Sequence, residues 1–265
     1  MVSLLRICQI AWKLINMNKN IETWLILGAS STISREFALQ MAEQNNKIIF
    51  AGRDLKNIEK ISKDIKIRHN IETEEIEIDI ISIQNHKQLV QQCVNKISGR
   101  LNIFVAIGTM PSQKNILNSD ALASKVINTN FTGVVNILLA FMPFFKSQKS
   151  GNIIVLGSVA GDRGRLSNYI YGSSKSGIHT FLQGFRTEMG KIGVNVTNIK
   201  LGPVDTRMSY GAGFDKIMAT PSATAAACIS ASKNKKGIVY FPWFWKYIMI
   251  VIRIIPEKLF NKFSL

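Results

Sequence analysis

The chain has 265 residues, 46% of them hydrophobic, and this composition excludes an intrinsically disordered protein. Its three cysteines and three histidines show no disulfide or metal-ligand spacing, so we expect no metal site, a reducing (cytoplasmic) compartment, and surface or structural histidines. The formal net charge of +16 suits an anionic partner. No nucleic-acid-binding motif accompanies it, which leaves a membrane surface or a merely lysine-rich composition.

Short β-rich runs alternate along the chain with stretches long enough for helices. Near-continuous apolar strands joined by helical crossovers predict an α/β fold, with a Rossmann-type, doubly wound parallel sheet of about seven strands. The strands are expected at residues 23–28, 47–52, 75–79, 102–107, 152–157, 194–200 and 237–241. No linker or repeat divides them, so residues 23–242 are expected to form a single domain, with amphipathic extensions at 1–22 and 243–265.

The first expected strand runs into the turn WLILGASSTIS, residues 24–34, which is typical of a dinucleotide-binding site. Such turns use about three glycines, whereas this one has Gly28 alone. Hydroxyls and backbone N–H groups at a helix N-terminus still favour a phosphate, although a simple helix cap would need no ligand. The residues expected to meet a cofactor here are Gly28, Ser30, Ser31, Thr32 and Ile33.

The second expected strand ends in FAGRD, where the choice between cofactors is made. A carboxylate at this point binds the ribose hydroxyls of NAD, whereas an arginine accommodates the 2′-phosphate of NADP. Arg53 therefore favours NADPH, while the neighbouring Asp54 keeps NADH open.

The stretch GSVAGDRGRLSNYIYGSSKSG, residues 157–177, carries the residues for chemistry. Tyr171 and Lys175 are four apart, so on a helix they share one face. An ammonium beside a phenol lowers the pKa of the phenol, which predicts that Tyr171 acts as a proton donor to an alkoxide. Ser158, at the end of a strand, is expected to hold the carbonyl oxygen.

With these motifs together, residues 23–242 resemble the short-chain dehydrogenase/reductase family. The resemblance implies catalytic roles for Ser158, Tyr171 and Lys175, and for Asn130 in NTNFTG, which would kink its helix and hold a water for proton relay. Lys175 would also bind the nicotinamide ribose. Further cofactor contacts are implied at Asp79 and Ile80 in EIDI, Ala106 and Gly108 in VAIGTM, Gly202, Val204 and Thr206 in LGPVDT, and at Tyr171.

The C-terminal segment FPWFWKYIMIVIRII, residues 241–255, is shorter than the roughly 20 apolar residues of a membrane span, and Lys246 and Arg253 interrupt it. Aromatic residues beside a basic stripe are typical of a helix in an anionic membrane interface, which predicts peripheral membrane association of 243–265. The same pattern also fits a helix packed on the substrate cleft or on a partner subunit. Residues 1–22 are amphipathic too, although Met17 offers an alternative start.

Within the family, the tail and GPVDTRMS resemble the decaprenylphosphoryl-2-keto-β-D-erythro-pentose reductases. That resemblance implies reduction, by NADPH or NADH, of a polyprenyl-phosphoryl 2-keto-pentofuranose to the arabinofuranose, after a flavin oxidase partner has made the ketone. Arg207 and Lys216 would meet the substrate phosphate, and a homodimer or homotetramer is expected. The alternatives are a general reductase of 3-oxoacyl or steroid-like substrates and an inactive nucleotide-binding scaffold.

Overall fold

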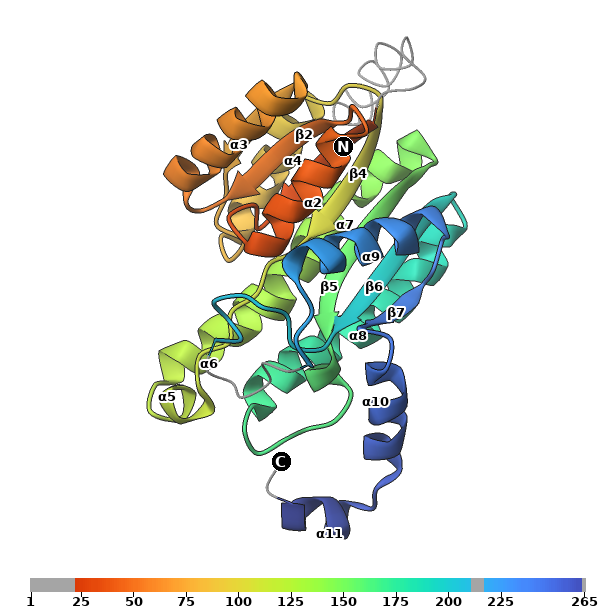
Figure 1. Ribbon diagram of the computed structural model, residues 1–265. Coiled ribbons are helices and arrows are strands. Elements are labelled where there is room, and N and C mark those ends of the chain that lie inside the picture. The colour runs from red at the N-terminus through yellow and green to blue at the C-terminus, as the bar shows by residue number, and fades with distance from the viewer. Residues whose placement is uncertain (1–21, 211–216, 264–265) are drawn as a thin grey trace.

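The computed structural model describes residues 22–210 and 217–263, and within these ranges seven parallel strands form one sheet. The strand order is β3-β2-β1-β4-β5-β6-β7 (Figure 1). Strands are added to one side of β1 as far as β3 and then to its other side from β4 on, so the order reverses between β1 and β4. This confirms the predicted doubly wound fold. The strands are β1 (Glu22–Leu27), β2 (Lys47–Gly52), β3 (Thr73–Glu77), β4 (Arg100–Val105), β5 (Gly151–Ser158), β6 (Val194–Leu201) and β7 (Ile238–Phe241).

Helices cover both faces of the sheet (Figure 1). The described α-helices are α2 (Thr32–Ala42), α3 (Leu55–His69), α4 (His86–Val94), α5 (Gln113–Leu117), α6 (Asp120–Ile127), α7 (Gly133–Gln148), α8 (Tyr169–Gly190), α9 (Pro221–Lys233), α10 (Trp245–Ile254) and α11 (Glu257–Phe260). Short helical turns lie at η1 (Ile83–Asn85), η3 (Val159–Gly161) and η5 (Asn261–Phe263), and a π-helical turn, η2, spans Asn128–Thr132.

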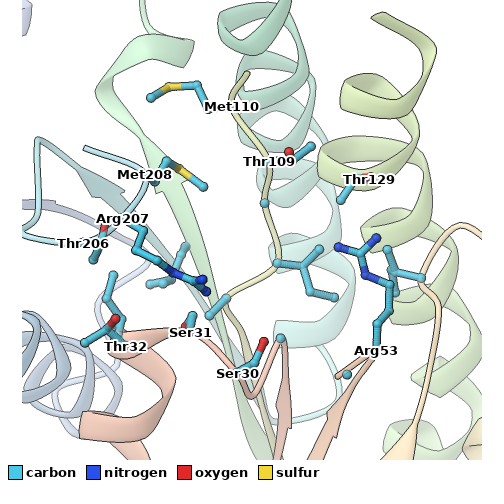
Figure 2. A pocket seen from close by; sticks show the side chains of 18 of the residues that line it. Ser30, Ser31, Thr32, Arg53, Thr109, Met110, Thr129, Thr206, Arg207 and Met208 are labelled. Carbon is cyan, nitrogen blue, oxygen red and sulfur yellow. The ribbon is translucent and has the colours of Figure 1, made fainter. Parts of the chain in front are cut away.

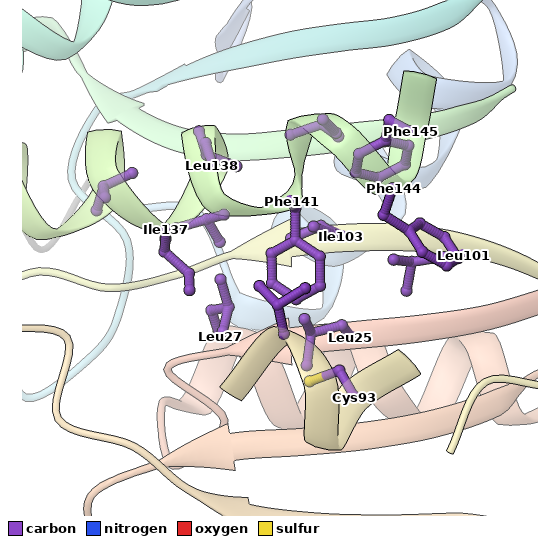
Figure 3. Packing of buried hydrophobic residues seen from close by; sticks show 14 of the residues in the cluster. Leu25, Leu27, Cys93, Leu101, Ile103, Ile137, Leu138, Phe141, Phe144 and Phe145 are labelled. Atoms are coloured by element: carbon purple, nitrogen blue, oxygen red, sulfur yellow. The ribbon is translucent and has the colours of Figure 1, made fainter. Parts of the chain in front are cut away.

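The burial of both faces explains why the strands read as near-continuous apolar runs. Along β1, Leu25 and Leu27 cluster with side chains of α4, α7 and α8, while Trp24 and Ile26 cluster with those of α2, α3 and α9. Figure 3 shows the first of these clusters, with Phe141 of α7 among Leu25, Leu27 and their neighbours. A parallel sheet buried on both sides needs apolar residues at successive positions, because alternate side chains point to opposite faces.

Two strands end two residues earlier than the sequence predicts. β3 stops at Glu77 rather than residue 79, and β4 stops at Val105 rather than residue 107. A pattern typical of a strand continues past the last paired residue in both cases, alternating after β3 and apolar after β4. The sequence pattern therefore does not show where pairing ends. Asp79 and Ala106 therefore lie beyond the strands, at the carboxyl edge of the sheet where ligands bind in doubly wound folds.

The segment Asp120–Gln148 joins α6, the π-helical turn and α7. Among the described residues it is the one helical segment long and apolar enough to span a bilayer by length and composition. Its residues Ile137, Leu138 and Phe141 are fully buried in the core on one face of the sheet (Figure 3). The segment therefore serves as a core helix of this fold.

The C-terminal tail begins with α10, which extends past the carboxyl ends of the strands (Figure 1). Trp245 and Met249 on one face of α10 are 5% and 1% exposed and cluster with Val159. This inner face fixes the tail to the domain, as one of the two sequence interpretations expected. The amphipathic extension expected at the N-terminus lies outside the described residues, apart from Glu22, which begins β1.

Candidate active site

A cavity of about 920 Å³ opens at the carboxyl edge of the sheet, where the strand order reverses between β1 and β4. This volume lies in the range of small-molecule and cofactor sites, about 300–1,000 Å³. Most of the residues expected from the sequence line it: Gly28, Ser30, Ser31, Thr32, Ile33, Arg53, Asp79, Ile80, Ala106, Gly108, Tyr171, Lys175 and Thr206. Asn130, Ser158, Gly202 and Val204 lie outside this lining.

The turn after β1 keeps its shape with a single glycine. Gly28 has φ +86°, and a Cβ there would lie 2.9 Å from the backbone carbonyl of Ala106, so a glycine is needed. Ser31 caps α2 by accepting a hydrogen bond from the Ser34 N–H at 3.0 Å. The Ser34 hydroxyl donates to the Gly28 carbonyl at 2.9 Å. These serine hydrogen bonds close the turn and place the N-terminus of α2, which favours anions, at the cavity.

Two arginines reach the cavity from opposite sides, with Ser30 and Ser31 between them at its base (Figure 2). Arg53 follows β2, and Arg207 follows β6. Asp54 also lines the cavity, but its carboxylate caps α3 by accepting a hydrogen bond from the Asn57 N–H at 3.2 Å. Arg53 therefore offers its cation at the end of β2 while the neighbouring carboxylate is engaged in a helix cap.

Tyr171 and Lys175 lie one turn apart on α8 and are 6% and 5% exposed. The Lys175 ammonium donates a hydrogen bond to the Leu156 carbonyl at 3.0 Å, which ties α8 to β5. The same nitrogen lies 5.8 Å from the centre of the Tyr171 ring. The i,i+4 spacing thus brings both side chains to the same wall of the cavity.

The expected lowering of the Tyr171 pKa is wrong for this structure. Burial raises the pKa of Tyr171 to about 12, against an opposing hydrogen bond with Ser158. Burial also lowers the pKa of Lys175 to about 8. Loss of hydration disfavours each charged form, and it is the largest cause of the pKa shift for both groups. Tyr171 is therefore protonated at neutral pH and available as a hydrogen-bond donor.

Ser158 ends β5 beside Tyr171. Its hydroxyl accepts a hydrogen bond from the Ala160 N–H at 3.2 Å, and Ser158 lies close enough to Tyr171 to oppose the rise in the Tyr171 pKa. Its backbone N–H donates to Nε2 of His179 at 3.4 Å. Although Ser158 does not line the cavity, these contacts hold its hydroxyl next to a residue that does.

Asn130 lies in the π-helical turn, in agreement with the expected irregularity of its helix. Its side chain is buried and clamps Thr109, accepting from the Thr109 N–H at 2.8 Å and donating to the Thr109 carbonyl at 2.9 Å. It also donates to the Ser174 hydroxyl of α8 at 3.1 Å. Asn130 thus fixes the chain after β4 against α8; its role in a proton relay stays a prediction.

Gly202 and Val204 have packing contacts in the structure. A Cβ on Gly202 would lie 2.1 Å from the Trp245 indole nitrogen, so this glycine makes room for α10. Val204 is buried and forms an isolated parallel bridge with Ala219. Their contacts with a cofactor remain predictions, while Lys216 falls outside the described residues.

Several lining residues were missed from the sequence. Thr109, Met110 and Pro111 directly follow VAIG, so their position after the end of β4 was the available signal. His179, which contacts Ser158, was missed because scattered histidines carry no spacing signal. Asp162, which lies against His179, was missed with it. Among the described residues, no cluster of His, Cys, Asp and Glu is arranged to hold a metal ion.

The family model described as short chain dehydrogenase matches residues 22–214. An uncharacterized oxidoreductase of Mycobacterium tuberculosis is 26% identical over 238 residues, which cover 90% of this chain and 95% of that protein. An uncharacterized oxidoreductase of Staphylococcus saprophyticus is 30% identical over 186 residues, covering 70% of this chain and 79% of that protein. A short chain dehydrogenase from Burkholderia cenocepacia, solved in complex with NADP, has a TM-score of 0.79 at 19% identity, covering 94% of this chain and 100% of that one. The chain is thus an oxidoreductase that belongs to the short-chain dehydrogenase family.

Proposed function

We propose that this protein is an NAD(P)H-dependent reductase of ketones. One observation carries the proposal: Tyr171 and Lys175 line the same cavity as the turn from Gly28 to Ile33. The cavity fits a dinucleotide, because it joins a helix N-terminus suited to a pyrophosphate with an arginine at the end of β2. The NADP bound by the Burkholderia cenocepacia relative supports this choice.

When bound, the reduced nicotinamide would supply the hydride for the carbonyl carbon of the substrate. The Ser158 hydroxyl would hydrogen-bond the carbonyl oxygen, and Tyr171 would give its phenolic proton to that oxygen as it becomes an alkoxide. An alkoxide is a stronger base than a phenolate, so a Tyr171 pKa of about 12 leaves the proton transfer downhill. Lys175, charged below about pH 8, would stabilise the phenolate that forms.

NADPH is the cofactor that the end of β2 favours. Arg53 reaches into the cavity (Figure 2), where its cation would pair with a 2′-phosphate. Asp54, whose carboxylate would otherwise compete for the ribose hydroxyls of NADH, accepts a hydrogen bond at the N-terminus of α3.

We propose a polyprenyl-phosphoryl 2-keto-pentofuranose as the substrate and the arabinofuranose as the product. Arg207 lines the cavity and offers a cation for the substrate phosphate. The tail supports a lipid-linked substrate, because α10 packs on Val159, the residue after Ser158. An upstream flavin oxidase would supply the ketone, and a homodimer or homotetramer would be the working form.

The outer face of α10 would bring the enzyme to the membrane. Four large apolar side chains of α10, and Trp243 just before the helix, are between 48% and 74% exposed: Trp243, Tyr247, Ile250, Val251 and Ile254. Exposed basic residues accompany them in the tail: Lys246, Arg253, Lys258 and Lys262. Aromatic and aliphatic side chains beside cations suit the interface of an anionic bilayer. We call this surface the outer face of α10 and propose that it binds the cytoplasmic membrane surface peripherally.

The assay for the substrate supplies the lipid-linked ketone, made in situ from polyprenyl-phosphoryl ribose by a flavin oxidase. Mass spectrometry and chromatography should then detect polyprenyl-phosphoryl arabinose and consumption of NADPH. Failure with this ketone, together with turnover of 3-oxoacyl thioesters or steroids, would identify a general reductase. If NADPH and NADH bind but no ketone is reduced, the chain is an inactive nucleotide-binding scaffold.

A further inference from the structure

A network of buried polar side chains lies against Ser158, outside the cavity lining. Nε2 of His179 accepts the Ser158 backbone N–H at 3.4 Å, and Nδ1 lies 3.3 Å from Oδ1 of Asp162, a close contact without hydrogen-bond geometry. The Lys200 ammonium donates to the same oxygen at 2.5 Å, and the Tyr240 hydroxyl donates to Oδ2 at 2.7 Å. The side chains of His179, Asp162 and Lys200 are 5%, 3% and 9% exposed.

The chain around Ser158 is shaped to admit the imidazole ring. A Cβ on Gly157 would lie 2.8 Å from Nε2 of His179, and a Cβ on Gly161 would lie 2.7 Å from its Cε1. Two glycines that flank Ser158 thus leave the space that His179 occupies. With its side chain 5% exposed, the ring is a tightly packed buried group.

The surroundings fix the proton arrangement of the ring. Burial lowers the pKa of His179, against the opposing effect of the Asp162 carboxylate, so the ring is neutral at physiological pH. Burial alone would raise the pKa of Asp162, but the nearby His179 and hydrogen bonds from Lys200 and Tyr240 hold it well below its usual value. A neutral ring beside a carboxylate places its proton on Nδ1, which leaves Nε2 free to accept the Ser158 N–H.

We infer that His179 is a positioning residue for ketone reduction, which orients Ser158 by accepting its backbone N–H and is itself oriented by Asp162. This inference rests on the proposed function. Tyr171, Lys175 and His179 are spaced four residues apart on α8, so one helix face presents the acid, its cation and the support of the serine. His179 lies outside the cavity lining and acts through Ser158.

Protonation of His179 would turn Nε2 from an acceptor into a donor and break its contact with the Ser158 N–H. The charged groups that face the ring are Asp162, which favours the imidazolium, and Lys200 and Lys175, which disfavour it. Tyr240 acts on it only through Asp162. The rate of reduction should therefore fall on the acidic side at a pH below the ordinary histidine pKa of about 6.5.

The first test is ¹⁵N NMR of the wild-type protein labelled at histidine, which needs no substrate. The chain has three histidines, so comparison with His179→Gln assigns the signal. We expect a neutral ring with its proton on Nδ1 at pH 7. An imidazolium at pH 7, or a proton on Nε2, would overturn the inference, because neither state can accept the Ser158 N–H.

The second test compares variants in reduction of an activated α-diketone by NADPH. His179→Leu should lower kcat by about ten- to a hundred-fold through displacement of Ser158, with the Kd for NADPH unchanged. His179→Gln, which keeps a neutral acceptor, should recover most of kcat and lose the acidic limb of the pH profile. Equal kcat in wild type and folded His179→Leu would reject the positioning role.

The matched control is Gln148→Leu, at the last residue of α7, which lies next to the start of β5 and far along that strand from Ser158. It removes two buried hydrogen bonds, with the Leu101 N–H and the Leu101 carbonyl, and a partly buried one to the Ser150 carbonyl. It should lower Tm yet leave kcat unchanged, which separates stability from positioning. If the wild type lacks turnover altogether, the proposed function fails instead, and the NMR result still decides the state of His179.

Discussion

Tyr171 and Lys175 are ionisable groups held almost out of water, and this burial sets their charge. The pKa of Tyr171 is raised to about 12 and that of Lys175 is lowered to about 8, both chiefly by loss of hydration. At neutral pH the pair is therefore a neutral phenol and an ammonium, which is the state needed to protonate an alkoxide. The sequence predicted the two partners but not the direction of the phenol shift, because helical spacing shows proximity and not burial.

The pH dependence of reduction should reflect Lys175. As pH rises through about 8, Lys175 loses its proton, the cation that stabilises the phenolate disappears, and kcat should fall. Tyr171 stays protonated in this range because its pKa is about 12. A profile of kcat against pH checks this, and a constant kcat up to pH 10 would contradict the assigned role of Lys175.

Arg53 should determine cofactor preference. Arg53→Ala should lower kcat/KM for NADPH by about ten- to a hundred-fold, the loss of a charge-assisted pair with a phosphate, and leave kcat/KM for NADH nearly unchanged. Lys56→Ala, an exposed cation on α3 outside the cavity lining, is the control and should change neither. A wild-type preference for NADH would contradict the choice of NADPH.

At the scale of elements, the packing of α10 against the end of β6 depends on the absence of a side chain at Gly202. In Gly202→Ala the new Cβ would lie 2.1 Å from the Trp245 indole nitrogen, so the ring and α10 must shift. We expect a loss of about 1–3 kcal/mol of stability, as for overpacking of a core, and a change in tryptophan fluorescence.

Gly184→Ala on α8 is the matched control for this glycine. No heavy atom lies within 4 Å of a Cβ built there, and replacing an interior helix glycine with alanine should raise stability by about 0.5–1 kcal/mol. Thermal unfolding of both variants checks the pair. Equal Tm values would show that Trp245 does not depend on the space at Gly202.

Elements were predicted better than their ends. The expected strand at 47–52 is β2, because apolar and β-branched residues and flanking turn residues define both of its limits. β3 and β4 end two residues early, because the sequence of a strand does not show where the neighbouring strand stops pairing with it. The supports of Ser158 could not be found from local patterns, because His179, Asp162, Lys200 and Tyr240 come from separate elements that only the folded sheet brings together.

At the scale of the whole molecule, the tail combines two roles that the sequence could not separate. The inner face of α10 packs on Val159 beside the serine site, and the outer face of α10 remains exposed. Contacts with the rest of the domain decide which face of α10 is buried and which is exposed, and helical periodicity alone does not show these contacts. The tail thus connects the site proposed for the ketone with the surface proposed for the membrane.

Replacing apolar residues on the outer face of α10 with glutamate should prevent membrane binding without unfolding the protein. In the double variant Ile250→Glu and Ile254→Glu, both side chains are exposed, so stability should change little. Co-sedimentation with anionic vesicles should fall strongly, and high salt should weaken the wild-type binding. Ile67→Glu, at an isoleucine of α3 that is 82% exposed, is the control and should bind like wild type. Undiminished binding by the double variant would assign the tail to packing alone.

The central claim is that Tyr171 donates the proton in an NAD(P)H-dependent reduction, and one comparison tests it directly. Tyr171→Phe removes a single oxygen from the cavity wall, so the Kd for NADPH, measured by cofactor fluorescence, should stay within a few-fold of wild type. Turnover of an activated α-diketone should fall by about 10²–10⁴-fold, the contribution of a positioned general acid. Turnover of Tyr171→Phe at the wild-type rate, with NADPH bound, would contradict the account.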